Sequence, residues 1–201
     1  MSQRKVALVI GAGSSLGSAI ARVFASDNYT TVVARRNGDE LGPLKEEIES
    51  KGGECLSFSL DARKEEDVIN FIEKIENEIG EINVAVYNIG ANIRFNILET
   101  TSRKYYKVWE MAAFGAFLMG REVARKMLPR KKGTIIFTGA TASVRGKEGF
   151  AAFSGAKQAK RALAQSMAKE LAPKGIHVAH IIVDGAIDTP VSYTHLRAHE
   201  T

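Results

Sequence analysis

Cysteine and long apolar runs are both scarce in this chain. Its 201 residues include a single cysteine, Cys55, which excludes an internal disulfide framework and is typical of a reducing cytoplasm. No apolar run approaches the roughly 20 residues that a transmembrane helix needs. The apolar stretch 6–10 is too short for the core of a signal peptide and is followed by glycines, so we interpret it as a buried strand. We therefore expect a cytoplasmic protein with no membrane partner.

A large excess of one charge is also lacking, with 28 Lys and Arg against 23 Asp and Glu and a formal net charge of +5. The densest basic cluster falls within 121–132, toward the end of a predicted helix, where cations complement the helix dipole. We interpret it as a solvated helix end and expect no nucleic-acid partner, although a nucleic-acid surface is the alternative. A hydrophobic content of 45% predicts one domain with a substantial core.

Short β-branched or aromatic runs alternate with helical patterns along the whole chain. The predicted strands are Lys5–Ile10, Thr30–Ala34, Glu54–Ser59, Ile82–Asn88, Gly133–Gly139 and His177–Val183. The segments between them carry apolar residues at helical spacing, most clearly in 68–79. This alternation predicts an α/β fold: a doubly wound, Rossmann-like parallel sheet of about six strands with helices on both faces.

A glycine-rich turn, Gly11–Gly17, connects the first strand to the first helix. Gly11 permits a tight turn, and Gly17 lets the helix approach the strand closely. The exposed amides at the start of the helix would then face a negatively charged pyrophosphate. The turn therefore predicts a dinucleotide site, with an ordinary strand-to-helix turn as the alternative.

The second strand ends in two arginines, Arg35 and Arg36. A site that prefers NAD usually has a carboxylate here for the ribose hydroxyls, whereas guanidinium groups pair with a 2′-phosphate. The arginines favour NADP over NAD as the cofactor. The alternative is that both side chains are simply solvated.

Residues from about 4 to 190 resemble the short-chain dehydrogenase/reductase family. The resemblance starts at the glycine motif, of which Gly11 and Gly17 match and Ser15 replaces a glycine. Further matches are Asp61, at the position of the family's adenine-binding aspartate, and the Asn88 and Gly90 pair. The cofactor-binding residues that this resemblance implies are Gly11, Ser14, Ser15, Leu16, Gly17, Arg35, Arg36, Asp61, Asn88, Gly90, Lys157, Gly185 and Thr189.

The catalytic motif departs from the family pattern, in which a tyrosine and a lysine lie one helical turn apart. Lys157 is present, but Phe153 replaces the tyrosine. By the family spacing, Ala140 replaces the catalytic serine and Ala112 the asparagine. In the family the lysine binds the nicotinamide ribose and lowers the pKa of the phenol, which exchanges a proton with the substrate oxygen. This chain lacks three of those four polar groups.

A substitute for the missing phenol is predicted at Thr141, which could hold a water together with Lys157. Tyr105 would reach the pocket only if its helix bends, and His180 is more typical of a structural residue. We predict an NADP(H)-dependent, short-chain-type oxidoreductase for an unknown carbonyl or alcohol substrate. The alternative is a catalytically impaired protein that binds NADP(H) as a sensor or as an inactive partner in an oligomer.

The last part of the sequence also differs from the family, which normally continues into a seventh strand and a final helix. We predict a C-terminally truncated protein with a domain at 1–191, and a non-native or disordered tail at 192–201. His195 and His199 have the spacing of metal ligands but no companions, so no metal site is predicted. The full-length form is expected to be a homo-oligomer with a small-molecule substrate.

Overall fold

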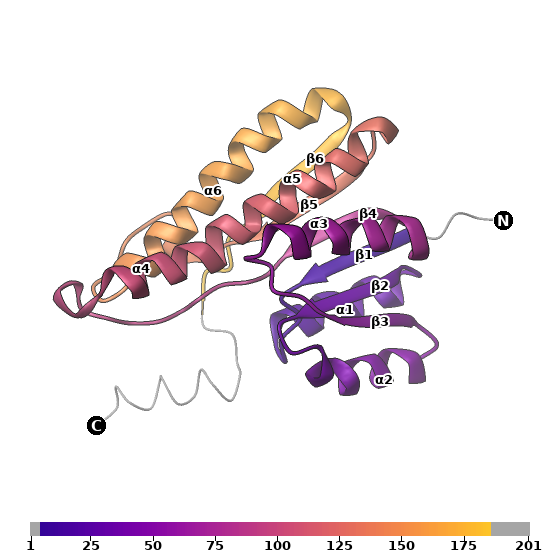
Figure 1. The fold of residues 1–201 in the computed structure, drawn as a ribbon, viewed down its shortest axis with the longest axis horizontal. Helices are drawn as coiled ribbons and strands as arrows, with labels where there is room; N and C mark the ends of the chain where they lie inside the picture. Colours follow the sequence, from indigo (N-terminus) through magenta and orange to yellow (C-terminus); the bar gives the residue numbers. More distant parts are fainter. Residues whose placement is uncertain (1–4, 186–201) are drawn as a thin grey trace.

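The computed structural model describes residues 5–185 (Figure 1). Thr189, His195, His199 and the predicted tail therefore lie outside the described residues. Six parallel strands form one sheet in the order β3-β2-β1-β4-β5-β6. The strands are β1 (Lys5–Ile10), β2 (Thr30–Arg35), β3 (Glu54–Ser59), β4 (Glu81–Tyr87), β5 (Gly133–Thr138) and β6 (Ile176–Ile181). The doubly wound parallel sheet predicted from the alternating pattern is confirmed.

Helices cover both faces of this sheet, with α1 and α2 on one face and α3, α5 and α6 on the other (Figure 1). The α-helices are α1 (Leu16–Ser26), α2 (Gly42–Ser50), α3 (Glu65–Lys74), α4 (Ser102–Trp109), α5 (Gly115–Met127) and α6 (Ala151–Leu171). The shorter turns are η1 (Gly38–Leu41), η2 (Ile75–Ile79), η3 (Ile97–Glu99), η4 (Glu110–Phe114), η5 (Leu128–Arg130), η6 (Thr141–Ser143) and η7 (Ala172–Lys174). α4 begins at Ser102, where the Thr101 side chain caps the helix by accepting the Lys104 N–H at 3.2 Å.

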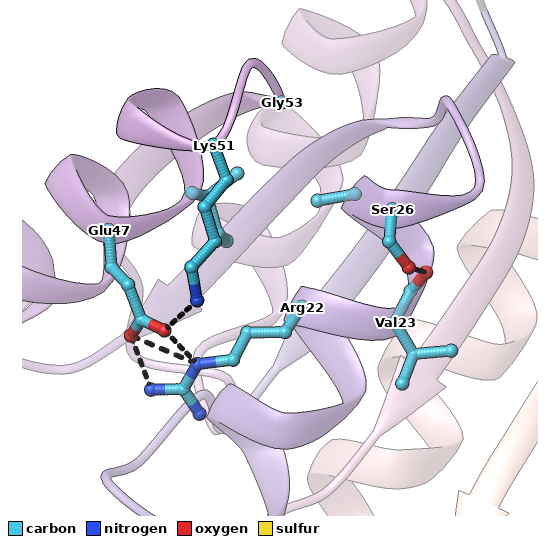
Figure 2. Close-up of a pocket in the computed structure, with 8 residues that line it drawn as sticks. Arg22, Val23, Ser26, Glu47, Lys51 and Gly53 are labelled. Atoms are coloured by element: carbon cyan, nitrogen blue, oxygen red, sulfur yellow. Dashed lines mark hydrogen bonds and ion pairs between the residues drawn. The ribbon is translucent and has the colours of Figure 1, made fainter.

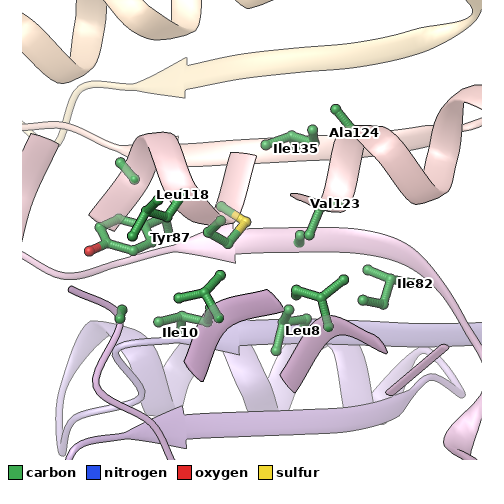
Figure 3. Close-up of a cluster of buried hydrophobic side chains, with 14 of the residues drawn as sticks. Leu8, Ile10, Ile82, Tyr87, Leu118, Val123, Ala124 and Ile135 are labelled. Atoms are coloured by element: carbon green, nitrogen blue, oxygen red, sulfur yellow. The ribbon is translucent and has the colours of Figure 1, made fainter. Parts of the chain in front are cut away.

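The core lies on both sides of β1, whose residues 6–10 are fully buried. This explains why the strand is apolar without alternation, as strands buried on both faces are. On one face, its side chains join those of β4 and α5 in one buried cluster that includes Leu8, Tyr87 and Leu118 (Figure 3). The buried Tyr87 hydroxyl donates a hydrogen bond to the Met111 carbonyl at 2.6 Å, which fastens β4 to η4.

The strand order reverses at β1, because β2 lies on one side of it and β4 on the other. Ligands of open α/β sheets bind at such a point, outside the carboxyl ends of the strands. The turn after β1 begins at Gly11, and the loop after β4 begins at Asn88. These two segments therefore mark the place where a ligand is expected.

Candidate functional site

The glycine turn has the close contacts that only glycine permits. Gly11 has a φ of +91° and donates its N–H to the Ala34 carbonyl at 2.8 Å. A Cβ on Gly17 would lie 2.4 Å from the Gly11 carbonyl oxygen, so a larger residue would push α1 away from the turn. Asn88 donates its side-chain amide to that same oxygen at 3.0 Å. Asn88 therefore stabilises the turn from the neighbouring strand.

The outer side of the turn is open. A Cβ on Gly13 would meet no atom within 4 Å. Ser15 stands at the start of α1 without capping it, and the first turn of the helix has no acidic residue. The amides of this helix start are therefore not satisfied by a capping side chain, and nothing in the first turn repels an anion. This arrangement of Ser14, Ser15 and Leu16 fits a pyrophosphate.

The two arginines after β2 have different surroundings. Arg35 forms an ion pair with Glu40 of η1 at 2.7 Å. Arg36 is exposed, and among residues 5–185 it has no hydrogen-bond or ion-pair partner. Arg36 is therefore the more available of the two guanidinium groups.

Asp61, two residues beyond β3, is held by a neighbouring cation. Arg63 donates two hydrogen bonds to its carboxylate, at 2.8 and 2.6 Å. These bonds lower the pKa of Asp61, against the opposing effect of its partial burial. Arg63 also lies 3.6 Å from Glu110 of η4. A ligand that uses the Asp61 carboxylate would share it with Arg63.

Lys157 and Phe153 lie together on the inner face of α6 and are both buried. The Lys157 ammonium lies 5.5 Å from the centre of the Phe153 ring and donates to the Thr138 carbonyl at 3.1 Å. A Cβ on Gly90 would be 3.2 Å from the Lys157 Nζ. The loop after β4 and the inner face of α6 are thus in direct contact, as the family resemblance implies.

The other two replaced positions offer no polar side chain. Ala112 is fully buried in η4, a π-helical turn, and packs with Val108, Ala152 and Ala156. Ala140 follows β5 and donates its backbone N–H to the Ser143 hydroxyl at 3.1 Å. Neither position therefore carries a side chain that can donate or accept a hydrogen bond.

Thr141, the predicted substitute, has a partner of its own. Its hydroxyl donates to the carboxylate of Asp184, just after β6. Gly185, the last described residue, has a φ of +155°. A water shared by Thr141 and Lys157 would compete with this hydrogen bond.

Tyr105 does not approach the lysine. A Cβ on Gly155 would lie 2.8 Å from the Tyr105 hydroxyl, so the phenol contacts α6 at Gly155. Gly155 is two residues from both Phe153 and Lys157, which places it on another side of the helix. Tyr105 is therefore not in position to replace a catalytic phenol.

Two polar residues near Lys157 were not predicted as functional. Lys160 is fully buried one turn further along α6. His180 of β6 packs against Gly139, and its Nε2 is buried without a hydrogen-bond partner among the described residues. Burial and the nearby lysines lower the pKa of His180 from 6.5 to about 4, so the imidazole is neutral at neutral pH.

A hollow of about 290 Å³ lies between α1 and α2, remote from the glycine turn (Figure 2). Arg22 and Lys51 both reach the Glu47 carboxylate there, with Nη2 and Nζ at 2.7 and 2.8 Å. Their hydrogen bonds lower the pKa of Glu47 to about 2. Because these three charged side chains pair with one another, they form an ion cluster between α1 and α2. The hollow is therefore not part of the candidate site.

The described residues contain neither of two other kinds of site. Within 5–185, no three His, Cys, Asp or Glu side chains are grouped so that they could hold a metal ion. No helix in that range is long and apolar enough to cross a membrane.

Comparisons with known proteins agree with the geometry. The family described as short chain dehydrogenase matches residues 5–199. A solved short-chain dehydrogenase from Rhodopseudomonas palustris is 48% identical with a TM-score of 0.86, over 98% of this chain and 92% of that one. A 3-oxoacyl-[acyl-carrier-protein] reductase from Bos taurus is 28% identical over 94% of this chain and 78% of that protein.

Other solved structures are similar and contain a cofactor. A metagenomic short-chain oxidoreductase in complex with NADP is 26% identical with a TM-score of 0.86, over 93% of this chain and 85% of that one. An NAD⁺-bound xylitol dehydrogenase is 29% identical with a TM-score of 0.86, over 92% of this chain and 72% of that one. From the family match and these likenesses, the chain belongs to the short chain dehydrogenase family of nucleotide-binding oxidoreductases.

Proposed function

We propose that this protein binds NADP(H) and acts as an oxidoreductase on the carbonyl or alcohol group of a small molecule. The observation that carries the proposal is the contact between Lys157 and Gly90, at the carboxyl end of β4 beside the open glycine turn. This contact supports a cofactor site of the short-chain dehydrogenase type even though the phenol is absent. Reduced nicotinamide supplies the hydride in such a reaction.

In this proposal the chain binds the cofactor along the carboxyl ends of the strands. The turn Gly11–Gly17 binds the pyrophosphate, and Asn88 keeps that turn in place. Lys157 binds the nicotinamide ribose from its position beside Gly90. Asp61 contacts the adenine while it remains paired with Arg63. Gly185 and Thr189 belong to the segment proposed to cover the nicotinamide.

The preference for NADP over NAD rests on the arginines, because similar structures hold either cofactor. Arg36 is the proposed main contact of the 2′-phosphate, and Arg35 the secondary one because Glu40 already holds it. A charge-assisted hydrogen bond contributes about 1.5–3 kcal/mol, so Arg36→Ala should weaken NADPH binding by about 10- to 100-fold. NADH binding should stay unchanged.

Fluorescence titration with NADPH and NADH tests this assignment. Arg35→Ala should have a smaller effect than Arg36→Ala, and Arg103→Ala, an exposed arginine of α4, is the matched control. Equal affinities of the wild type for NADPH and NADH would contradict the preference. Absence of saturable binding of either cofactor would contradict the proposed function as a whole.

A second candidate function is cofactor binding without turnover, as a sensor or as an inactive partner in an oligomer. The observation that favours it is the set of carbon-only side chains at Phe153, Ala140 and Ala112. The discriminating experiment gives purified protein NADPH and a broad panel of carbonyl compounds. Tight NADPH binding with no oxidation of NADPH across the panel would favour this candidate over the enzyme.

Self-association and a cytoplasmic location complete the proposal. A row of stacked aromatic rings runs from Tyr106 through Trp109 and Phe114 to Phe117, and all of them except the half-buried Phe114 are exposed. A second copy of the chain would remove this apolar row from water, which favours a homo-oligomer. Sedimentation velocity tests this, with Trp109→Ser expected to weaken association.

The single cysteine, Cys55, is a buried free thiol, as expected for a protein of the reducing cytoplasm.

A further inference from the structure

Two loops are joined at Arg94: the β4 loop (residues 88–101), between β4 and α4, and the β5 loop (residues 139–150), between β5 and α6. The Phe95 N–H of the first loop donates to the Gly149 carbonyl of the second at 2.8 Å. A Cβ on Gly149 would lie 2.7 Å from the Arg94 Cγ and 2.9 Å from its Nε, so the stem of Arg94 lies directly against the Gly149 backbone. Gly149 has a φ of +77°, which glycine adopts without the strain that a side chain would add. This junction therefore fixes the course of the Arg94 side chain.

The junction is connected to the candidate site through both loops. In the β4 loop, Ile93 packs against the buried cluster that includes Ala112, the position where the family resemblance implies an asparagine. In the β5 loop, the Phe150 ring lies 6.3 Å from the Phe153 ring, centre to centre. Both loops leave the carboxyl ends of their strands, where ligands of open α/β sheets bind. Arg94 is therefore placed at the rim of the site, on the side of the replaced catalytic positions.

The surface around this junction carries most of the net charge of the chain. Segments 88–107 and 139–150 contain six cations and two carboxylates, an excess of four positive charges in a chain whose formal net charge is +5. All eight side chains are exposed, and none of them forms an ion pair with another residue of 5–185. The cations are Arg94, Arg103, Lys104, Lys107, Arg145 and Lys147, and the carboxylates are Glu99 and Glu148. The rim of the site therefore attracts anions.

Among these cations, Arg94 combines a fixed stem with a free end. Its stem lies against Gly149, whereas its guanidinium group has no hydrogen-bond or ion-pair partner in the described part of the chain. By contrast, Arg121 of α5 is held between Glu65 and Glu122. A planar guanidinium group presents parallel N–H donors that match two oxygens of a carboxylate or a phosphate. Because its stem is already ordered, Arg94 loses less side-chain entropy on binding such a group than a fully mobile arginine would.

We propose that Arg94 is a specificity-determining residue that binds an anionic group of the substrate. The substrate is then a carbonyl or alcohol compound that also carries a carboxylate or a phosphate. Gly149 is a positioning residue, because it gives the Arg94 stem its place. The unpaired cations around Arg94 add a longer-range attraction that weakens as salt is added. The inference rests on the proposed function for the reaction itself, because Arg94 takes no part in hydride transfer.

Calorimetric titration of the protein saturated with NADP⁺ tests this proposal, because a ketone can bind to the complex with oxidised cofactor without being reduced. The probes are matched pairs: 2-oxobutanoate, levulinate and 6-oxoheptanoate, each with its methyl ester, and 2-oxopropylphosphonate with its dimethyl ester. At least one anion should bind about tenfold more tightly than its ester, a ratio between that of an exposed ion pair and that of a buried charge-assisted hydrogen bond. A larger ratio for the phosphonate identifies a phosphate-bearing substrate, and a larger ratio for an oxo acid identifies a carboxylate.

Variants assign this preference to a residue. Arg94→Met should remove it, with unchanged affinity for the esters and for NADP⁺. Arg94→Lys should retain part of it, because the charge stays while the bidentate geometry is lost. Gly149→Ala should reduce it, because the new Cβ displaces the Arg94 stem. Arg103→Met, which replaces an exposed arginine of the same basic surface, is the matched control and should retain it.

The opposing outcomes are distinct. Equal binding of every anion and its ester would overturn the proposal, and so would a failure of all the anions to bind or a preference that survives in Arg94→Met. An equal loss in Arg94→Met and Arg103→Met would also overturn it, because it would show a diffuse attraction instead of a contact at Arg94. Titration with NADP⁺ alone judges the proposed function separately. A protein that binds NADP⁺ but shows no preference for anions refutes only the role of Arg94.

Discussion

Replacing Lys160 with methionine should change how the stability of this protein depends on pH. Lys160 is fully buried, so its amine holds a proton much less readily in the folded chain than in the unfolded one. Methionine keeps an unbranched apolar side chain of similar length but has no titrating group. The substitution therefore isolates the contribution of one buried amine to the free energy of unfolding.

The expected sign and magnitude follow from proton counting. Burial lowers the pKa of Lys160 well below 10.5 in the folded chain, whereas the unfolded chain keeps the ordinary value, so between these two values the unfolded chain holds a proton that the folded chain has lost. The unfolded state therefore binds one proton more, and the free energy of unfolding rises by about 1.4 kcal/mol for each pH unit in this window. Lys160→Met removes the titrating group, so the part of this rise that comes from Lys160 should vanish. The Ile89 carbonyl loses a donor at a cost of about 1–3 kcal/mol, but that cost does not depend on pH.

Urea unfolding at a series of mildly alkaline pH values, followed by circular dichroism, measures this slope. The difference between the wild type and Lys160→Met is the informative quantity, because the titration of the other lysines is common to both. Lys169→Met, at the exposed side of the same helix, should retain the wild-type slope. Parallel curves for the wild type and Lys160→Met would refute the reasoning, since a protonated Lys160 in the folded state would produce them.

Further predictions concern the ring, the imidazole and the glycine turn. Phe153→Tyr places a phenol beside Lys157 and should raise kcat by about 10²-fold for a ketone that the wild type accepts, since proton transfer contributes on that order. An unchanged kcat in assays of NADPH oxidation would show that proton supply does not limit turnover. His180 has a pKa of about 4 instead of 6.5, so the wild type should lose stability as the pH falls from 6.5 to about 4. His180→Gln should reduce that loss in urea unfolding. Equal losses in the two proteins would count against the lowered pKa of His180. Gly17→Ala forces a Cβ against Gly11 and should weaken NADPH binding about tenfold or more (about 1.4 kcal/mol) without loss of secondary structure; wild-type affinity by fluorescence titration would contradict the role of the turn.

Strand positions could be predicted well because a buried parallel strand is apolar throughout, as β1 is. Helix starts were harder. α6 begins at Ala151, and Phe150 before it supplies no capping side chain that a sequence motif would show. α4 does have such a signal in Thr101, which the apolar pattern alone overlooked. Hydrophobic periodicity alone therefore does not locate these helix starts, and only α4 carries a capping residue that does.

The contacts of the candidate site could likewise be predicted only in part. Contacts that follow from topology, such as Gly90 against Lys157, could be expected from motif spacing. The partners of Asp61 and Thr141 depend on side-chain conformations and on Arg63 and Asp184, which no motif specifies. Lys160 had a readable signal, because its spacing of three residues from Lys157 places both on one helix face. That signal was overlooked because an inward lysine contradicts the usual preference of lysine for the surface.

The structure of the π-helical turn η4 affects how the sequence of such a protein can change during evolution. Its geometry depends on the Tyr87 hydroxyl, which bonds the Met111 carbonyl, and on Gly115, where a Cβ would lie only 2.1 Å from that hydroxyl. Neither contact involves the side chain of Ala112. The backbone at position 112, where the family resemblance implies an asparagine, is thus maintained by residues other than the one at that position. Mutation could therefore exchange the side chain at position 112 while the surrounding architecture persists, which makes this scaffold a natural starting point for new activities.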